Sequence, residues 1–348
     1  MHNLTRSSPD AARLLIIRFS SFGDIVQAVG VPTAFRKNYP GAEVDWLVRA
    51  DFSSLVEDHP EIRKVHSFSR DSGLVGLMRL AWQLAAGGGY THLYDAHNNL
   101  RSNVFCLVYR LRRPLVNFAR RPKNRWRRWL FFRFRLPVLQ MPFRGANSFH
   151  EPLKPWGLAP AVPIGRQFYS NADLPGEVER ELQSLSGPII ALAPSAAWQM
   201  KRWPIENWKA LVQLLPEMRF VCLGGPEDRF INDISLVAPE RCLNLAGRLK
   251  LNQNAAIFAQ ADLVIANDTG LLHVADQMER PTIALIGPTA FGYPSHPSSR
   301  ELEIDLSCKP CSKDGRGQCV NSVYQRCLVE LSPERVAQTA RELLARNY

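Results

Sequence analysis

The sequence predicts an α/β protein with two Rossmann-like domains whose parallel sheets face one another across a cleft. Three observations support this prediction. The chain has 348 residues, more than one hydrophobic core usually holds. Short apolar runs alternate with helix-like segments, which is typical of βαβ units. A proline-rich stretch at 152–163 interrupts the alternation, and the pattern then starts again.

The first half opens with the apolar run RLLIIRF at 13–19, which is typical of a buried parallel strand. A polar turn containing Gly23 follows, and we expect a helix from there to about Asn38. Further strands are expected at 43–48 and 92–97. This order of elements predicts a parallel sheet.

The second half repeats the arrangement, with a helix expected at 207–215 and a last helix at 332–346. Ser332 is the expected N-cap of that last helix. We therefore expect domains at 1–160 and 161–331, followed by a C-terminal helical segment at 332–348. The strands expected in the second domain are 189–195, 219–225, 262–268 and 282–288.

The net charge of +11 comes from one part of the chain. Residues 96–150 contain thirteen Lys and Arg and no acidic residue, whereas the rest is close to neutral. A protein that binds polyanions along its whole length is therefore excluded. No apolar run reaches the roughly 18 residues of a membrane-spanning helix. The beginning lacks the pattern of a signal peptide, so we expect a cytoplasmic protein.

Two junctions between a strand and a helix carry candidate functional residues, because ligands of parallel α/β sheets bind at the carboxyl ends of strands. At the first junction Asp24 follows Gly23. It is either an acid in the first turn of a helix or an exposed general base. At the second, polar groups open a helix whose free N–H groups suit an anion: Asn267, Asp268, Thr269, Gly270 and, one turn on, His273.

Two further loops follow predicted strands. Ser195 precedes the pair Lys201 and Arg202 and the aromatic Trp203. This loop is either a solvated basic segment or a site that neutralises a diphosphate beside an aromatic surface. Glu227 and Asp228 in the other loop either cap a helix or bind ribose hydroxyls. The absence of GxxxxGK[ST], and of GxGxxG after the first strand, disfavours kinase and dehydrogenase functions.

Six segments in order resemble bacterial glycosyltransferase family 9, the ADP-heptose:lipopolysaccharide heptosyltransferases, over nearly the whole chain. The most specific stretch is 261–289. The segments are FGD (22–24), YDAHNNLRS (94–102), KRWP (201–204), LGGPED (223–228), ADLVIANDTGLLHVA (261–275) and PTIALIGPT (281–289).

The resemblance implies a GT-B fold, with the acceptor held by the first domain and the nucleotide-sugar by the second. It also implies that the final helix packs back towards the first domain. By position, Asp24 resembles the general base and Lys201 the lysine that contacts the diphosphate. The implied donor site consists of Ser195, Arg202, Glu227, Asp268, Thr269, Gly270 and His273.

The implied activity is inverting, metal-independent transfer of a heptose from ADP-heptose to the inner core of lipopolysaccharide, with no cofactor required. Three alternatives remain open at this stage. They are a transferase that uses another nucleotide-sugar, a sugar-nucleotide epimerase with the GT-B fold, and a non-catalytic adaptor that binds membranes or polyanions.

The basic segment interleaves arginine with aromatic residues, as in RRPKNRWRRWLFFRFR at 120–135. An exposed solvated helix is the simplest interpretation, but so one-sided a charge favours a phosphorylated lipid A–core acceptor and an anionic membrane. We therefore expect a peripheral protein on the cytoplasmic face of the inner membrane. No nucleic-acid motif is present. The residues expected to bind acceptor or membrane are His97, Arg101, Arg120, Arg121, Arg125, Arg127 and Arg128.

Four cysteines cluster near the end of the chain, at Cys308, Cys311, Cys319 and Cys327. Their number and the close first pair are typical of a structural site for zinc or another metal. Two disulfides and four free thiols are the alternatives, of which a cytoplasmic location disfavours the first.

Overall fold

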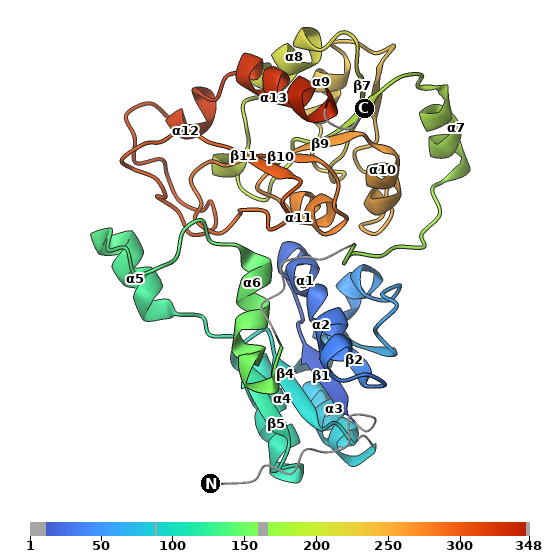
Figure 1. Cartoon of the computed structure of the whole chain (residues 1–348), viewed down its shortest axis with the longest axis vertical. Helices are drawn as coiled ribbons and strands as arrows, with labels where there is room; N and C mark the ends of the chain where they lie inside the picture. The colour runs from blue at the N-terminus through green and yellow to red at the C-terminus, as the bar shows by residue number, and fades with distance from the viewer. Residues whose placement is uncertain (1–11, 88, 159–165, 346–348) are drawn as a thin grey trace. The chain divides into compact units, whose positions relative to one another are not determined.

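The computed structural model describes residues 12–87, 89–158 and 166–345 (Figure 1). The chain divides into two compact units. The first unit runs to Asn124 and also contains Ala146–Tyr169, and the second contains Arg125–Gly145 and continues from Ser170. Each unit is built around its own parallel sheet.

The described part of the first unit has a five-stranded sheet in the order β3-β2-β1-β4-β5. All neighbouring strands are parallel, and the order is that of a Rossmann sheet. The expected strands at 13–19, 43–48 and 92–97 are confirmed with slightly different ends. The strands are β1 (Arg13–Ile17), β2 (Glu43–Arg49), β3 (Lys64–Phe68), β4 (His92–Asp95) and β5 (Asn117–Arg120).

Helices α3 (Gly73–Gly87) and α4 (Leu100–Arg112) pack side by side. Their inward side chains, among them Leu77, Ala81 and Phe105, form a core with Leu15 and Ile17 of β1 and with Leu93. The buried positions of α3 recur every four residues, as expected for one face of a helix. Each helix thus buries one side and leaves the other to solvent.

The single helix expected up to Asn38 is instead two helices, α1 (Phe22–Ala28) and α2 (Gly30–Asn38). Next to the break, a Cβ at Gly30 would lie 3.2 Å from the buried ring of His150, so the chain approaches that ring closely. Pro32, in the first turn of α2, has no backbone N–H to donate to the carbonyl of Ala28, which favours a break there.

The described part of the second unit has a six-stranded parallel sheet in the order β11-β10-β9-β6-β7-β8. This is again the Rossmann order, so the two halves share one topology without sharing sequence. The four predicted strands are confirmed, although each ends earlier. The strands are β6 (Ile189–Ala193), β7 (Arg219–Cys222), β8 (Cys242–Asn244), β9 (Leu263–Asn267), β10 (Thr282–Leu285) and β11 (Ser299–Leu302).

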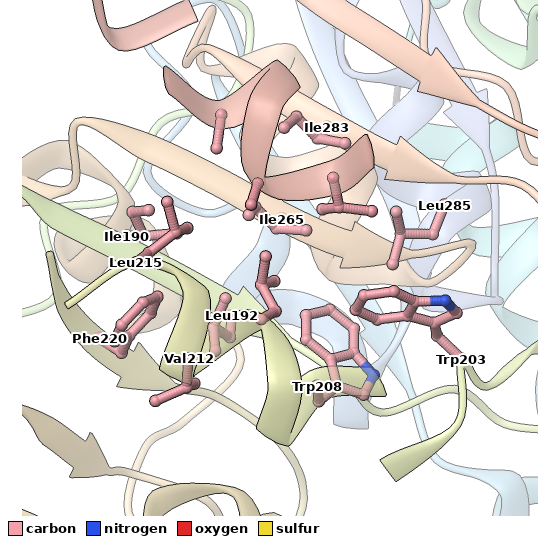
Figure 2. Close-up of a cluster of buried hydrophobic side chains, with 14 of the residues drawn as sticks. Ile190, Leu192, Trp203, Trp208, Val212, Leu215, Phe220, Ile265, Ile283 and Leu285 are labelled. Atoms are coloured by element: carbon pink, nitrogen blue, oxygen red, sulfur yellow. The ribbon is translucent and has the colours of Figure 1, made fainter. Parts of the chain in front are cut away.

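Figure 2 shows the core of the second unit, where apolar side chains of β6, β9 and β10 meet two tryptophans. Trp203 and Trp208 pack edge to face with ring centroids 5.0 Å apart, and both are fully buried. Trp208 belongs to α8 (Ile205–Leu214). These indoles fill the volume between that helix and the sheet.

The last helix, α13 (Pro333–Ala345), packs against α8 and against β9 and β10 of the second unit. Val336, Ala340 and Leu344 join the core of that unit. The return of this helix towards the first domain stays a prediction. Ser332 caps the helix as predicted, because its Oγ accepts from the backbone N–H of Arg335 at 3.3 Å. Arg346 lies outside the described residues.

The basic segment is divided between the two units. Helix α5 (Arg125–Phe134) and the chain to Gly145 belong to the second unit, whereas the expected domains place the whole segment in the first. Phe143 packs edge to face on Phe291, and Arg144 forms an ion pair with Glu301 at 2.8 Å. These contacts explain the assignment to the second unit.

The predicted linker at 152–163 begins as a short 3-10 helix, Glu151–Trp156, which contains Pro152 and Pro155. Pro160 and Pro163 lie outside the described residues. Among the helices that the structure describes, none combines the length and the apolar composition that crossing a membrane requires.

Candidate functional site

Both candidate junctions lie where the strand order of a sheet reverses. In the first unit this point is between β1 and β4, and in the second between β6 and β9. Loops that leave such neighbouring strands diverge to opposite faces of the sheet and leave room for a ligand. Each unit is described separately below.

Asp24 lies in the first turn of α1, directly after β1. Its Oδ2 accepts from Ser21 Oγ at 2.9 Å and pairs with Arg18 at 2.5 Å, while Oδ1 lies 3.7 Å from the guanidinium of Arg121. The carboxylate side chain is 36% exposed. It is therefore held in place and still open to an incoming group.

Two arginines determine the charge state of Asp24. Burial alone would raise its pKa, but the positive charges of Arg18 and Arg121 lower the pKa to about 2. Burial lowers the pKa of Arg18 to about 10, so its guanidinium stays charged at neutral pH. Both guanidiniums lie on the ring of Phe149, at 5.4 and 3.8 Å from its centroid. Asp24 is consequently a fixed, ionised carboxylate.

His97, from the loop after β4, belongs to the same electrostatic environment. Burial, with the positive charge of Arg18, lowers its pKa to about 3, so the ring is neutral. Among the described residues its buried Nδ1 has no hydrogen-bond partner. His97, predicted to bind acceptor or membrane, thus lies near Asp24, and its ring offers an unused polar atom there.

The arginines predicted in the first unit have different positions. Arg121 donates to Ser148 Oγ at 2.7 Å as well as facing Asp24. Arg120 instead donates to the fully buried Asp95 at 2.9 Å, which is a structural ion pair. Arg101 is exposed at the start of α4.

In the second unit Asp268 is the central residue after β9. Its Oδ2 accepts from Thr289 Oγ1 at 2.5 Å and pairs with Lys201 Nζ at 3.0 Å. Burial would raise its pKa, but the charge of Lys201 and the bond from Thr289 lower the pKa below the usual value. This ion pair joins the loop after β6 to the loop after β9 and directs the ammonium group to the strand ends.

Two glycines make room for this ion pair. A Cβ at Gly292 would lie 2.0 Å from Asp268 Cγ, and one at Gly315 would lie 2.6 Å from the methylenes of Lys201. Gly315 also has a φ of +88°, which a side chain rarely adopts. Both backbones therefore approach the pair more closely than any other residue type allows.

A second polar network surrounds Asp228, the second acid of the loop predicted to cap a helix or bind ribose hydroxyls. This buried carboxylate accepts from Ser195 Oγ at 2.5 Å and from the N–H of Gly225 at 2.9 Å, and pairs with Arg202 at 3.3 Å. Asp228 thus positions two predicted donor-site residues. Its neighbour Glu227, which the resemblance implies as the acid that contacts the nucleoside, is exposed.

The sequence predicts that Trp203 forms an aromatic surface beside Lys201. This prediction is wrong, because the indole of Trp203 is buried in the core. Its backbone N–H donates to Asn267 Oδ1 at 3.1 Å, and Asn267 Nδ2 donates to the carbonyl of Pro194 at 2.7 Å. Asn267 therefore ties the two loops together. The exposed indole in this loop is Trp198.

Helix α11 (Gly270–Gln277) starts directly after Asp268. Thr269 is its N-cap residue, but the Thr269 side chain makes no capping hydrogen bond. The partial positive charge of the helix N-terminus therefore remains available to an anion. His273 is buried one turn further on, and its charge would stabilise that of Asp268.

Close to Glu227, a groove of about 340 Å³ lies at the ends of β7 and β8. It is lined by backbone and polar side chains from Gly225, Pro226, Asp228, Arg229, Asn232, Asn244 and Ala246. Its polar lining and its place beside the Asp228 network suit a ribose or base rather than an apolar ligand.

Helix α5 carries the most basic part of the sequence. Arg125 and Arg127 are exposed, as are the stacked indoles of Trp126 and Trp129, 4.7 Å apart. Arg128 instead lies over the ring of Phe291 at 4.3 Å and anchors the helix. The predicted basic residues thus separate into one anchor and a pair that faces solvent.

The cysteine cluster does not have the geometry of a metal site. All four thiols are free, and Cys327 is buried in the core of the second unit. Within the residues that the structure describes, no three Cys, His, Asp or Glu side chains are placed to bind one ion. Cys319 accepts from the N–H of Gln325 at 3.3 Å instead.

Comparisons with known proteins agree with this architecture. The family model of glycosyltransferase family 9 (heptosyltransferase) matches residues 165–325. Lipooligosaccharide heptosyltransferase 2 of Haemophilus influenzae is 32% identical over 96% of this chain and 99% of its own length. The corresponding protein of Haemophilus ducreyi is 27% identical with the same coverage.

Solved structures show the same fold. ADP-heptose LPS heptosyltransferase II of E. coli has a TM-score of 0.70 at 20% identity, covering 96% of this chain and 99% of that one. The glycosyl transferase family 9 protein of Veillonella parvula has a TM-score of 0.75 at 19% identity, covering 97% and 98%.

Proposed function

Because this chain belongs to glycosyltransferase family 9, the heptosyltransferases, we propose that it transfers a heptose from ADP-heptose to the inner core of lipopolysaccharide. The observation that carries the proposal is the set of cationic groups at the strand ends of the second unit. Lys201, Arg202 and the uncapped N-terminus of α11 belong to two neighbouring loops that Asn267 ties together.

The second unit is proposed to bind the donor. Lys201 and the N–H groups of α11 would neutralise the diphosphate, and Arg202, ordered by Asp228, would support them. The groove beside Glu227 would take the nucleoside. As the C1–O bond to the β-phosphate breaks, the same groups stabilise the negative charge on the leaving ADP.

Asp24 is proposed as the general base. A hydroxyl oxygen of the acceptor attacks C1 of the heptose, the bond to ADP breaks in the same displacement, and Asp24 takes the hydroxyl proton. The configuration at C1 is therefore inverted. The fixed position of Asp24 and its partial exposure support this role. Its low pKa ensures that it is ionised before the acceptor arrives.

Helix α5 is proposed to contact the acceptor, which would bring the protein to the cytoplasmic face of the inner membrane. Its exposed arginines suit the phosphates of a lipid A–core acceptor, and its exposed indoles suit the lipid interface. Replacing Arg125 and Arg127 by Ser is expected to raise KM for the acceptor with little change in ADP affinity. An unchanged acceptor KM would contradict this assignment.

A panel of sugar donors tests the proposed function. ADP-heptose, other ADP-sugars and UDP-sugars are each supplied with two lipopolysaccharide acceptors, one truncated before the first heptose and one truncated after it, and release of ADP or UDP is measured. We expect release from ADP-heptose only, and only when the acceptor is present. Faster release from a UDP-sugar would reject the donor, and conversion of a sugar-nucleotide without acceptor would indicate an epimerase.

A further inference from the structure

The outer surface of α3 and α4 is apolar and basic, and no other part of the chain that the structure describes covers it. Val75 and Trp82 of α3 are 58% and 50% exposed, and Leu107 and Leu111 of α4 are 61% and 72% exposed. Leu115, just after α4, is 96% exposed. Apolar side chains in such number on one surface are typical of an interaction site.

These side chains belong to one continuous surface. The guanidinium of Arg112 lies 4.6 Å from the ring of Trp82, and Arg113 donates to the carbonyl of Ala85 at 2.8 Å. The two helices therefore lie side by side with their C-terminal ends together. A shallow groove of about 390 Å³ runs along α3, with Val75, Arg79 and Trp82 in its lining.

The charge of this surface has a single sign. Between Ser72 and His150 the only acidic residue is Asp95, which is fully buried and paired with Arg120. The basic residues of this surface are all arginines: Arg79, Arg101, Arg110, Arg112 and Arg113. A protein partner would have to supply acidic and apolar groups together. An anionic bilayer offers negatively charged phosphates and apolar acyl chains over a wide area.

We propose that the outer surface of α3 and α4 docks the first unit on an anionic lipid bilayer. The exposed leucines and Trp82 enter the boundary between headgroups and acyl chains, where an indole is favoured. The arginines extend from the same helices to the lipid phosphates, with their methylenes along the apolar side chains. This surface is separate in sequence from α5. The inference rests on the proposed function only in that a lipid-linked acceptor brings the protein to a membrane.

Binding to lipid vesicles tests the proposal with the full chain and without donor or acceptor. Wild-type protein is floated with vesicles of phosphatidylcholine and phosphatidylglycerol in equal parts, and with vesicles of phosphatidylcholine alone. The first variant carries Leu107→Gln and Leu111→Gln, and the second carries Arg110→Gln and Arg112→Gln. The control carries Leu236→Gln and Val320→Gln, which replace similarly exposed side chains of the second unit.

Wild type and control are expected to bind the anionic vesicles and to bind the neutral vesicles weakly. Each of the two α4 variants should lower the partition coefficient about tenfold, because it removes either two apolar side chains or two charges from the interface. Thermal unfolding checks that the variants are folded. We expect them to fold, because the replaced side chains are exposed.

Partition coefficients of the two α4 variants equal to that of the control would overturn the proposal. So would a wild-type dimer that Leu107→Gln and Leu111→Gln convert to a monomer, since the surface would then bind a second copy. If the transfer assay rejects the proposed function, this test still applies, because vesicle binding requires no sugar transfer. Loss of vesicle binding in the α4 variants with normal turnover of a soluble acceptor fragment would separate docking from catalysis.

Discussion

Two carboxylates, Asp24 and Asp268, each lie beside the point where the strand order of their sheet reverses, yet their surroundings differ. Both follow a strand at the point where the strand order reverses. Asp24 is paired with arginines and is 36% exposed, whereas the Asp268 side chain is 9% exposed and is enclosed by Thr289, Lys201 and Gly292. The first carboxylate is accessible to a substrate, and the second is committed to holding a lysine.

This difference shows how one topology supports two roles. Neighbouring positive charges stabilise the ionised form of both carboxylates. The two carboxylates differ only in the exposure of their side chains and in the residues that they pair with, and these differences distinguish the proposed base from the positioning residue. The predictions below test this separation, beginning with the largest expected effect.

Replacing Asp24 by Asn should lower kcat for transfer by about 10²–10⁴-fold, because Asn cannot take a proton from the acceptor hydroxyl. Release of ADP from ADP-heptose in the presence of acceptor measures the effect. Asp51→Asn is the matched control, since Asp51 is an exposed acid of the same unit that pairs with Arg49. A variant of Asp24 that kept most of the wild-type kcat would exclude it as the base.

Replacing Lys201 by Ala should weaken ADP binding by about 10- to 100-fold, the range expected for loss of a charge-assisted contact. It should also slow transfer, because the leaving diphosphate loses a stabilising charge. Lys209→Ala is the control, as Lys209 is a partly exposed lysine of α8 that pairs with Glu206. Normal ADP affinity and normal turnover together would remove Lys201 from the site.

Gly315 and Gly317 offer a smaller and more specific test. Both have positive φ, +88° and +95°, so Ala at either position should destabilise the chain by about 1–2 kcal/mol. Only Gly315 touches the stem of Lys201. We expect Gly315→Ala to weaken ADP binding several-fold and Gly317→Ala to leave it unchanged. Equal effects on ADP affinity would show that backbone strain, and not the position of Lys201, matters.

The smallest expected effect is a pH dependence of stability. Asp24 has a folded pKa of about 2, below its usual 3.8, so the folded chain binds this proton more weakly than the unfolded chain. Its stabilising contribution is complete above pH of about 4 and is lost as the pH falls towards 2.

The free energy of unfolding of wild type and of Asp24→Asn, measured from neutral to acidic pH, tests this dependence. The difference between them should shrink in acid and should stay below about 1 kcal/mol, because solvent screens a carboxylate that is 36% exposed. A difference that grows in acid would contradict the low pKa.

The sequence predicts the strands well because each buried parallel strand is a continuous apolar run, as in β1 and β9. The edge strands β3 and β5 lack such a run and were not identified. Asp24, Lys201 and Asp268 are predicted as site residues because each follows a strand that ends in a polar loop. These positions need no knowledge of packing.

Other features depend on contacts between distant residues. Arg18 and Arg121 are 103 positions apart in the sequence, so their joint effect on Asp24 cannot be inferred from spacing. Trp203 was predicted beside the ligand, but its indole donates to the carbonyl of Leu331 at 2.9 Å inside the core. The assignment of α5 to the second unit likewise follows from the packing of Arg128 on Phe291.

The central claim is that Asp24 removes a proton and does not bind the donor, whereas Lys201 binds the donor. Calorimetric titration of ADP into wild type, Asp24→Asn and Lys201→Ala tests this division most directly. We expect Asp24→Asn to bind ADP within about twofold of the wild-type Kd and Lys201→Ala to bind at least about tenfold more weakly. Equal loss of ADP affinity in both variants would contradict the account.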